Sequence, residues 1–277
     1  MGRQAGELRL PILLFPNLWK SVSICGDLFR FVIRMQVNFV IGGTQKGGTS
    51  ALDSFLRQHP QICLPEKKEL HFFDREENFA KSPNYKKYHT HFHPGVEHRV
   101  IGEATPIYMY WNPAPSRIWN YNPEMKWIMV LRNPVERAFS AWNMETKRGA
   151  ETLPFQKAVE TEKDRCRAAL PLQHRVFSYL DRGFYAHQVR RLFDLFGREK
   201  CLVLLNEDLR TDHTNTLRSV FDFLGVDNSL VPPEASVFEQ DYDESVDAAL
   251  SSRLKEMFHF DIKELERLLG RDLSGWY

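Results

Sequence analysis

Short apolar runs alternate with amphipathic segments along most of the chain. The runs have the length of buried strands, and the segments repeat apolar residues at helical spacing. We expect strands at Val37–Ile41, Ile62–Leu64, Val100–Glu103, Trp127–Leu131 and Leu202–Leu205. We expect helices at Ser50–Gln58, Val135–Lys147, Leu153–Arg165, Tyr185–Phe196, Thr214–Leu224 and Ala248–Leu269, the last broken near Phe260. This alternation predicts an α/β fold, with a central parallel sheet flanked by helices.

Two segments do not follow the alternating pattern. Leu8–Ile33 is rich in apolar residues, but it is interrupted by Pro11, Pro16, Lys20, Asp27 and Arg30. It has no unbroken run of the ~20 residues that a spanning helix needs, so we predict no membrane span. Residues 1–34 are interpreted as an extension and 35–277 as a single domain. Arg148–Arg175 is polar and weakly patterned, which fits either a solvated helix pair or a lid.

Composition disfavours several classes of protein. The 37 Lys and Arg nearly balance the 36 Asp and Glu of this 277-residue chain, which argues against a nucleic-acid-binding surface. The four cysteines are scattered and form no CxxC pair, so we expect reduced thiols and a cytoplasmic location. His89, His91 and His93 have no cysteine or carboxylate at ligand spacing, so we interpret them as a surface loop and predict no metal site.

A glycine-rich turn, GTQKGGTS, follows the first expected strand at Gly43–Ser50. A Walker loop places its lysine directly before the hydroxyl residue, whereas here Gly47-Gly48-Thr49 separates Lys46 from Ser50. Backbone N–H groups at the start of a helix, together with the lysine charge, form an anion site. The alternative is a turn with a purely structural role.

A second loop follows the strand Trp127–Leu131, in the stretch KWIMVLRNPVERAFSAW. The strand ends in Arg132, where a P-loop NTPase has an acid that organises Mg²⁺. An arginine instead binds an anion, often through two hydrogen bonds, and Ser140 lies two turns further on. The alternative is an arginine in a surface ion pair.

The start of the next helix carries its own signals. Asn133 is expected to be the N-cap, Pro134 suits the first helical position, and Glu136 completes a pattern like a capping box. These signals stop the strand at Arg132, which therefore lies at the carboxyl end of the strand. Ligands of parallel sheets bind at this end.

The two loops together resemble the sulfotransferases that use 3′-phosphoadenosine 5′-phosphosulfate (PAPS). GTQKGGTSAL resembles their 5′-phosphosulfate loop, and LRNPVERAFSAW resembles their 3′-phosphate segment. The likeness is greatest to the heparan-sulfate-type and bacterial branch. It implies a P-loop-like strand–loop–helix whose donor-binding residues are Gln45, Lys46, Gly47, Gly48, Thr49, Ser50, Arg132, Ser140 and Tyr185. For Tyr185, a core position on an amphipathic helix is the equal alternative.

A third motif, PEKKELHFFD at Pro65–Asp74, resembles the family segment that supplies the catalytic base. The resemblance implies that Glu69 is the base and His71 its neighbour, with His71 as the competitor for that role. A carboxylate can take the proton that an acceptor hydroxyl or amine loses. If the segment is extended, Glu69, His71 and Phe73 point to one side. Without the resemblance, the charged residues here would indicate a solvated turn.

The chain also departs from the family pattern. In IGEATPIYMYW, Ala104 stands where the family often has a lysine, and Ser50 replaces an arginine of some glycan-modifying members. The cysteine-flanked Lys-Gly-Arg loop of those members is missing from the C-terminal part. These differences argue against a sulfated polysaccharide and favour a smaller acceptor or a bacterial pathway.

The sequence therefore predicts an enzyme that moves a sulfuryl group from PAPS to a hydroxyl or amine of a small-molecule or glycan acceptor. Lys46 would stabilise the leaving phosphate, and adenosine 3′,5′-bisphosphate would be the product. The resemblance implies no metal. Two alternatives remain open, a P-loop kinase of a small molecule and a non-catalytic nucleotide-binding domain.

Overall fold

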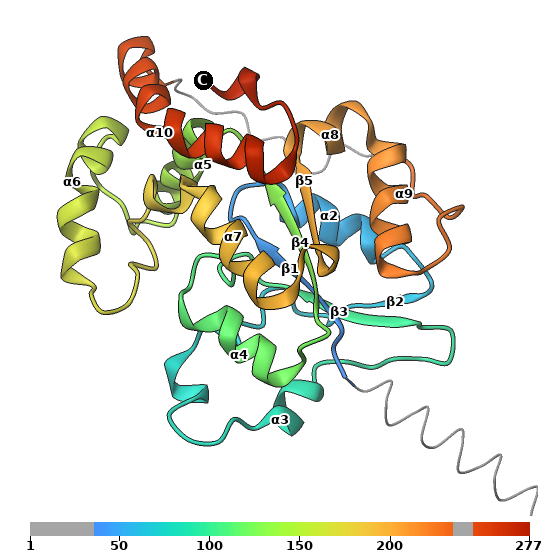
Figure 1. Cartoon of the computed structure of the whole chain (residues 1–277). Helices are drawn as coiled ribbons and strands as arrows, with labels where there is room; N and C mark the ends of the chain where they lie inside the picture. The colour runs from blue at the N-terminus through green and yellow to red at the C-terminus, as the bar shows by residue number, and fades with distance from the viewer. Residues whose placement is uncertain (1–35, 235–245) are drawn as a thin grey trace, which may run out of the picture.

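The computed structural model describes residues 36–234 and 246–277. Five parallel strands form one sheet in the order β2-β3-β1-β4-β5 (Figure 1). The strands are β1 (Phe39–Gly43), β2 (Ile62–Cys63), β3 (Val100–Ala104), β4 (Lys126–Leu131) and β5 (Cys201–Leu205). Each lies within a residue or two of its expected place, which confirms the predicted parallel sheet.

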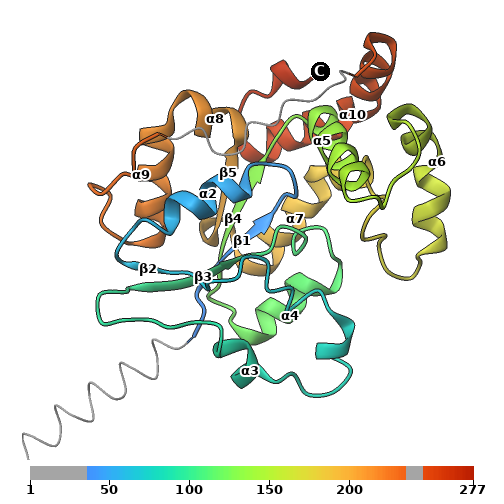
Figure 2. The same cartoon turned by 180° about the vertical axis from the view of Figure 1, so that it is seen from behind.

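Helices cover both faces of the sheet, as its apolar strands require. Phe39 and Ile41 of β1 face one layer, which contains α2 (Thr49–Leu56) and α9 (His213–Leu224). Val40 faces the other layer, and the two layers lie on opposite faces of the sheet (Figure 2). That layer contains α4 (Pro113–Tyr121), α5 (Pro134–Lys147), α7 (Tyr185–Phe196) and α10 (Ala248–Leu269). Alternate strand residues thus enter two separate apolar cores.

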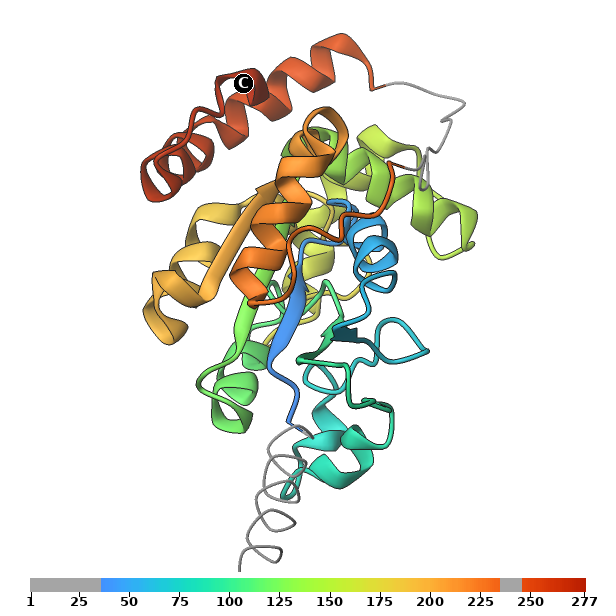
Figure 3. The same ribbon diagram turned by 90° about the vertical axis from the view of Figure 1, so that its right-hand side faces the viewer.

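The helix α10 lies across the end of the sheet toward which β4 points (Figures 1 and 3). It runs without a break from Ala248 to Leu269, so the expected interruption near Phe260 is wrong. Phe258 and Ile262 are buried, whereas Phe260 is 84% exposed. Phe260 disturbed the apolar pattern because it lies on the solvent face of the helix.

The segment between α5 and α7 contains one helix, α6 (Phe155–Ala168), followed by a loop. The expected helix pair is therefore wrong. The loop runs from about residue 169 to η2 (Asp181–Gly183) and returns to the strand ends. The remaining short elements are α3 (Tyr85–His89), α8 (Asn206–Thr211), η1 (Glu76–Asn78), η3 (Arg198–Lys200) and η4 (Ser274–Trp276).

The expectation for residues 1–34 lies outside the described residues. Within the described part of the chain, no helix is both long enough and apolar enough to span a bilayer.

Candidate active site

The three sequence motifs meet at the carboxyl ends of the strands. The donor loop, Thr44–Gly48, connects β1 to α2, and Arg132 follows β4. The base segment, Pro65–Asp74, follows β2 and is fixed to the end of β3, because the Glu69 N–H donates to the Ala104 carbonyl at 3.0 Å. A parallel sheet gathers its ligand-binding loops at this edge.

The donor loop presents the positive end of α2. The N-cap, Gly48, has a left-handed backbone with φ of 114°, no side chain caps the helix, and its first turn contains no acidic residue. A Cβ atom at Gly47 would lie 2.1 Å from the Val130 carbonyl oxygen, so only glycine fits there. The first N–H groups of a helix have no partner within it, and they favour an anion. The loop thus has the shape and the dipole of an anion site.

Positive side chains gather around this helix end. Burial lowers the pKa of Lys46, and the nearby charges of Arg132, Arg148 and Lys147 lower it further, while the Glu145 carboxylate opposes the shift. Like charges that approach one another are unfavourable, and an anion placed among them relieves their repulsion. The cluster therefore suits a ligand with several negative charges.

Arg132 is held at the start of α5. The Asn133 side chain accepts hydrogen bonds from the N–H groups of Val135 (3.0 Å) and Glu136 (3.3 Å), which confirms it as the N-cap. The Glu136 carboxylate does not complete a capping box. It accepts from Nε and Nη2 of Arg132 at 3.0 and 2.9 Å, because the two side chains are four residues apart.

Tyr185 and Ser140 are both buried, and Tyr185 contacts this arginine. Tyr185 is 0% exposed, and its hydroxyl donates to the Arg132 carbonyl at 2.8 Å. Ser140 is 1% exposed on the inner face of α5. Tyr185 therefore supports the main chain of Arg132 from the core, which is the alternative that the sequence left open.

Glu69, His71 and Asp74 form a row of ion pairs in the base segment. His71 Nδ1 lies 3.0 Å from Asp74 Oδ2, and His71 Nε2 lies 3.4 Å from Glu69 Oε2. Lys68 Nζ donates to Glu69 Oε1 at 2.8 Å. The expected extended conformation is wrong, because Glu69 and His71 have left-handed φ values of 62° and 54°. Two left-handed residues turn the chain so that both side chains still meet.

The charges of this row reinforce one another. Hydrogen bonds to Asp74 and to Glu69 raise the pKa of His71 to about 9. Burial favours neutral Glu69, but hydrogen bonds and charges from His71 and Lys68 outweigh it and lower the pKa of Glu69 to about 2. His71 and Arg175 likewise lower the pKa of Asp74 despite its burial. At neutral pH, Glu69 is therefore ionised and His71 is protonated.

A buried carboxylate, that of Glu103, is linked by hydrogen bonds to the base segment. Glu103 of β3 is 0% exposed and accepts hydrogen bonds from Tyr88 (2.7 Å), Thr105 (2.7 Å) and Tyr108 (3.0 Å). The Tyr108 hydroxyl in turn accepts from the Phe72 N–H at 3.0 Å. Burial raises the pKa of Glu103. This network fixes the main chain between His71 and Asp74.

Several residues of the site were not predicted. Asp74 stands in the quoted motif HFFD, and Glu103 is a charged residue in an otherwise apolar strand, so both had a local signal. Arg175 donates to Asp74 Oδ2 at 2.6 Å from the loop after α6, 101 residues further along the chain. No local pattern could indicate a contact over that separation.

The expected histidine loop has no metal-binding arrangement. His89 ends α3, where its Nε2 lies 2.8 Å from the Tyr121 hydroxyl, and His91 and His93 are exposed. The described residues contain no group of three His, Cys, Asp or Glu side chains placed to hold a metal ion.

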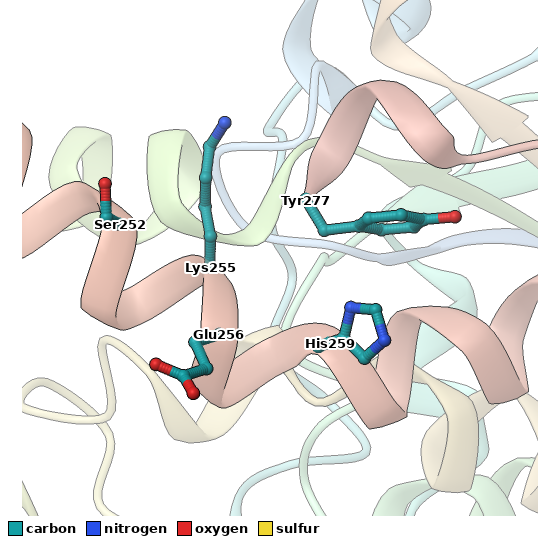
Figure 4. A pocket seen from close by; sticks show the side chains of 5 residues that line it. All are labelled: Ser252, Lys255, Glu256, His259 and Tyr277. Carbon is teal, nitrogen blue, oxygen red and sulfur yellow. The ribbon is translucent and has the colours of Figure 1, made fainter.

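Two surface hollows lie among other residues. One, of about 350 Å³, is lined by Ser252, Lys255, Glu256 and His259 of α10 and by Tyr277 (Figure 4). The other, of about 510 Å³, lies between α9 and the loop at 229–234. Neither is lined by a predicted site residue.

Comparison with known proteins decides the family. Residues 37–257 match the sulfotransferase domain model. The chain belongs to the sulfotransferase family. A solved sulfotransferase from Alicyclobacillus acidocaldarius superposes with a TM-score of 0.76 and 34% identity, over 87% of this chain and 98% of that one. This sulfotransferase is also 31% identical, over 68% of its length, to mouse heparan sulfate glucosamine 3-O-sulfotransferase 3A1.

Human heparan sulfate glucosamine 3-O-sulfotransferase 6 is 32% identical over 68% of the chain. The chain spans about half the length of these curated relatives, at 45% and 52%. These matches confirm the resemblance stated from the motifs and the expected fold. They do not report on individual site residues, so the assignments of those residues stay predictions.

Tyr108→Phe is expected to impair the sulfotransferase by releasing the base segment. It leaves the buried Phe72 N–H without its partner, so we expect a loss of about 1–3 kcal/mol in unfolding free energy and a fall in turnover. Tyr88→Phe is the matched control, because it removes one hydrogen bond to Glu103 but keeps the ring that packs on Phe72 and Phe73, and its hydroxyl makes no hydrogen bond to that segment. Urea unfolding and turnover are measured for both. Equal turnover in the two variants would contradict the anchoring role.

The ion pairs of His71 should make stability depend on pH. Because the pKa of His71 is raised from 6.5 to about 9, its contribution is complete below about pH 6.5 and is lost as pH rises through 9. We therefore expect the difference in unfolding free energy between wild type and His71→Gln to be flat from pH 5 to 6.5 and to shrink toward pH 9. Urea unfolding of both proteins from pH 5 to 10 measures this difference. A difference that stays constant up to pH 10 would contradict the raised pKa of His71.

Proposed function

We propose that this chain transfers a sulfuryl group from PAPS to a hydroxyl or amine of a small-molecule or glycan acceptor, and releases adenosine 3′,5′-bisphosphate. One observation carries the proposal. An uncapped helix end surrounded by Lys46 and Arg132 lies at the same sheet edge as an ionised carboxylate, Glu69. Anion binding and proton removal are the two tasks of this reaction.

The residues present fit the donor. It supplies a sulfuryl group on a phosphate leaving group and carries a second phosphate on the ribose. The loop amides and Lys46 would hold the phosphosulfate and stabilise charge on the leaving oxygen. Arg132 would hold the 3′-phosphate through its guanidinium, with Ser140 as a second donor to it. Tyr185 would support Arg132 from the core. The crowded cations around Lys46 favour such a doubly anionic ligand.

Glu69 is the better candidate for the base. A base needs a free lone pair, and a protonated imidazole has none. His71, with a pKa of about 9, is protonated at neutral pH, whereas Glu69 is ionised. His71 would orient Glu69 and stay charged, held by Asp74.

The kinase alternative is not favoured. A P-loop kinase needs an acid for Mg²⁺ after the neighbouring strand, and β4 is followed by Arg132, whose guanidinium cannot hold a metal. The family assignment agrees with this argument.

The acceptor and the location remain proposals. The two curated relatives are heparan sulfate glucosamine 3-O-sulfotransferases. In this chain, however, Ala104 is 1% exposed beneath the base segment, where the family pattern often has a cation. A smaller or less acidic acceptor fits that difference better. Cys63, Cys166 and Cys201 are free thiols, which agrees with the proposed cytoplasmic location.

Adenosine 3′,5′-bisphosphate is expected to raise the melting temperature far more than adenosine 5′-monophosphate. A ligand at 100 times its Kd adds about 2.7 kcal/mol of stability. Arg132→Ala should weaken bisphosphate binding by roughly 1.5–3 kcal/mol, the range for a hydrogen bond to a charged group. Arg57→Ala is the control, because Arg57 also pairs with a carboxylate four residues away, at the other end of α2. Equal shifts with both nucleotides would remove the 3′-phosphate assignment.

Glu69→Gln should abolish most turnover without disturbing the donor site. A carboxylate base contributes about 10²–10⁴-fold to rate, so we expect turnover to fall by that factor. Bisphosphate affinity, measured by calorimetry, should stay within about threefold of wild type, because the effect belongs to proton transfer. Glu66→Gln changes an exposed carboxylate of the same segment and is the control.

The assay is slow hydrolysis of PAPS, in which water takes the place of the acceptor and sulfate and adenosine 3′,5′-bisphosphate are released. His71→Ala is measured beside Glu69→Gln. If Glu69→Gln keeps near-normal turnover and His71→Ala is inactive, His71 is the base.

A further inference from the structure

Arg182 is a buried arginine between the two halves of the candidate active site. It lies in η2 and is 1% exposed. Its Nη1 donates to Gln45 Oε1 at 2.5 Å, its Nε to Ser178 Oγ at 2.8 Å, and its Nη2 to the Arg175 carbonyl at 2.5 Å. Its guanidinium also lies 4.8 Å from the centroid of the Tyr110 ring. All three nitrogens are thus occupied by neutral groups.

This arrangement is costly for the fold. Burial lowers the pKa of Arg182 to about 10. The three groups that accept its hydrogen bonds carry no formal charge. A buried charge is unfavourable unless it is paired, and an apolar side chain of similar volume often serves stability equally well. The planar fork of the guanidinium instead provides three donors in fixed directions. The contribution of Arg182 is therefore the fixed direction of its hydrogen bonds.

The acceptors of Arg182 belong to two different parts of the site. Gln45 directly precedes Lys46 in the donor loop. Arg175 extends in the other direction, where Nη1 donates to Asp74 Oδ2 at 2.6 Å and Nη2 donates to the Asp74 carbonyl. The Arg175 guanidinium also lies 4.1 Å from the centroid of the Trp111 ring. A continuous set of hydrogen bonds thus runs from the donor loop to Asp74, and through His71 to Glu69.

We propose that Arg182 is a positioning residue that fixes the donor loop against the base segment through Arg175. It touches neither donor nor acceptor. It sets the distance between the group that holds the phosphosulfate and the group that takes the proton. Displacement of a reacting group by about 1 Å can cost on the order of 10² in rate, so a rigid connection between the two loops matters for transfer.

The test compares two buried arginines. Arg182→Met removes the three hydrogen bonds and keeps a side chain of similar length. Arg137→Met is the matched control, because Arg137 is also fully buried and donates to the Tyr179 carbonyl, and its other partner is Tyr185, outside the donor loop and the base segment. Any effect on donor binding through Tyr185 does not enter a rate measured at saturating PAPS. For each variant, three quantities are measured: the melting temperature, the single-turnover rate of PAPS consumption at saturating PAPS, and the NMR titration midpoint of His71.

We expect Arg182→Met to lower the single-turnover rate by about 10–100-fold. We also expect it to move the His71 midpoint toward its ordinary value by about one pH unit or more, since loosening Arg175 releases Asp74 and weakens its hydrogen bond to His71. Arg137→Met should leave both quantities near wild type, whatever it does to the melting temperature. If Arg182→Met does not fold, Arg182→Lys takes its place, because a single ammonium cannot reproduce the planar fork.

A folded Arg182 variant with wild-type rate and wild-type His71 midpoint would overturn the proposal. Equal changes in the Arg182 and Arg137 variants would also overturn it, because they would indicate general loosening of the core. The proposal rests on the proposed sulfuryl transfer, but the two fail differently. The His71 titration is measured without any nucleotide and tests the connection alone, whereas absence of PAPS consumption by the wild-type protein would refute the transfer.

Discussion

The parallel direction of all five strands determines where this protein can carry polar chemistry. Both faces of the sheet are buried under helices, so charged side chains can gather only where the strands end. All carboxyl ends lie at one edge, which brings together loops that are far apart in the sequence. The donor loop, Arg132 and the base segment come from three different strands and meet there. Site and fold therefore follow from the same constraint.

Within this edge, the backbone is strained at the residues that carry the proposed chemistry. Among the described residues, the non-glycine positions with positive φ are Lys46, Glu69 and His71. Such conformations cost on the order of 1–3 kcal/mol each and persist only where the surroundings enforce them. The hydrogen bond from Glu69 to the end of β3 and the Glu103–Tyr108 network provide that enforcement. These buried hydrogen bonds thus offset the backbone strain and hold Glu69 and His71 in position.

The sequence predicted the parts of the site that depend on local pattern. The strands, the N-cap Asn133 and the glycine-rich loop follow from short stretches of chain, whereas the Glu69–His71 pair was implied by the family resemblance. Prediction was wrong where tertiary packing decides, as at the exposed Phe260 of α10 and in the left-handed turn of the base segment. It missed Arg175, because contacts between residues about a hundred positions apart leave no local signal. Residues that act through their sequence neighbours could therefore be predicted, whereas long-range contacts such as that of Arg175 with Asp74 could not.

The low pKa of Glu69 bears on how the proposed base would work. Charges of alternating sign run through the segment and its neighbour, in the order Lys68, Glu69, His71, Asp74 and Arg175. A proton taken by Glu69 would leave its positive neighbours unbalanced, so the protonated state has a high free energy. Such a carboxylate is a weak base in the free protein, but it returns its proton to solvent readily. The row of charges thus favours rapid recovery of the base over strong basicity, and the positioning of the acceptor must supply the rest of the rate.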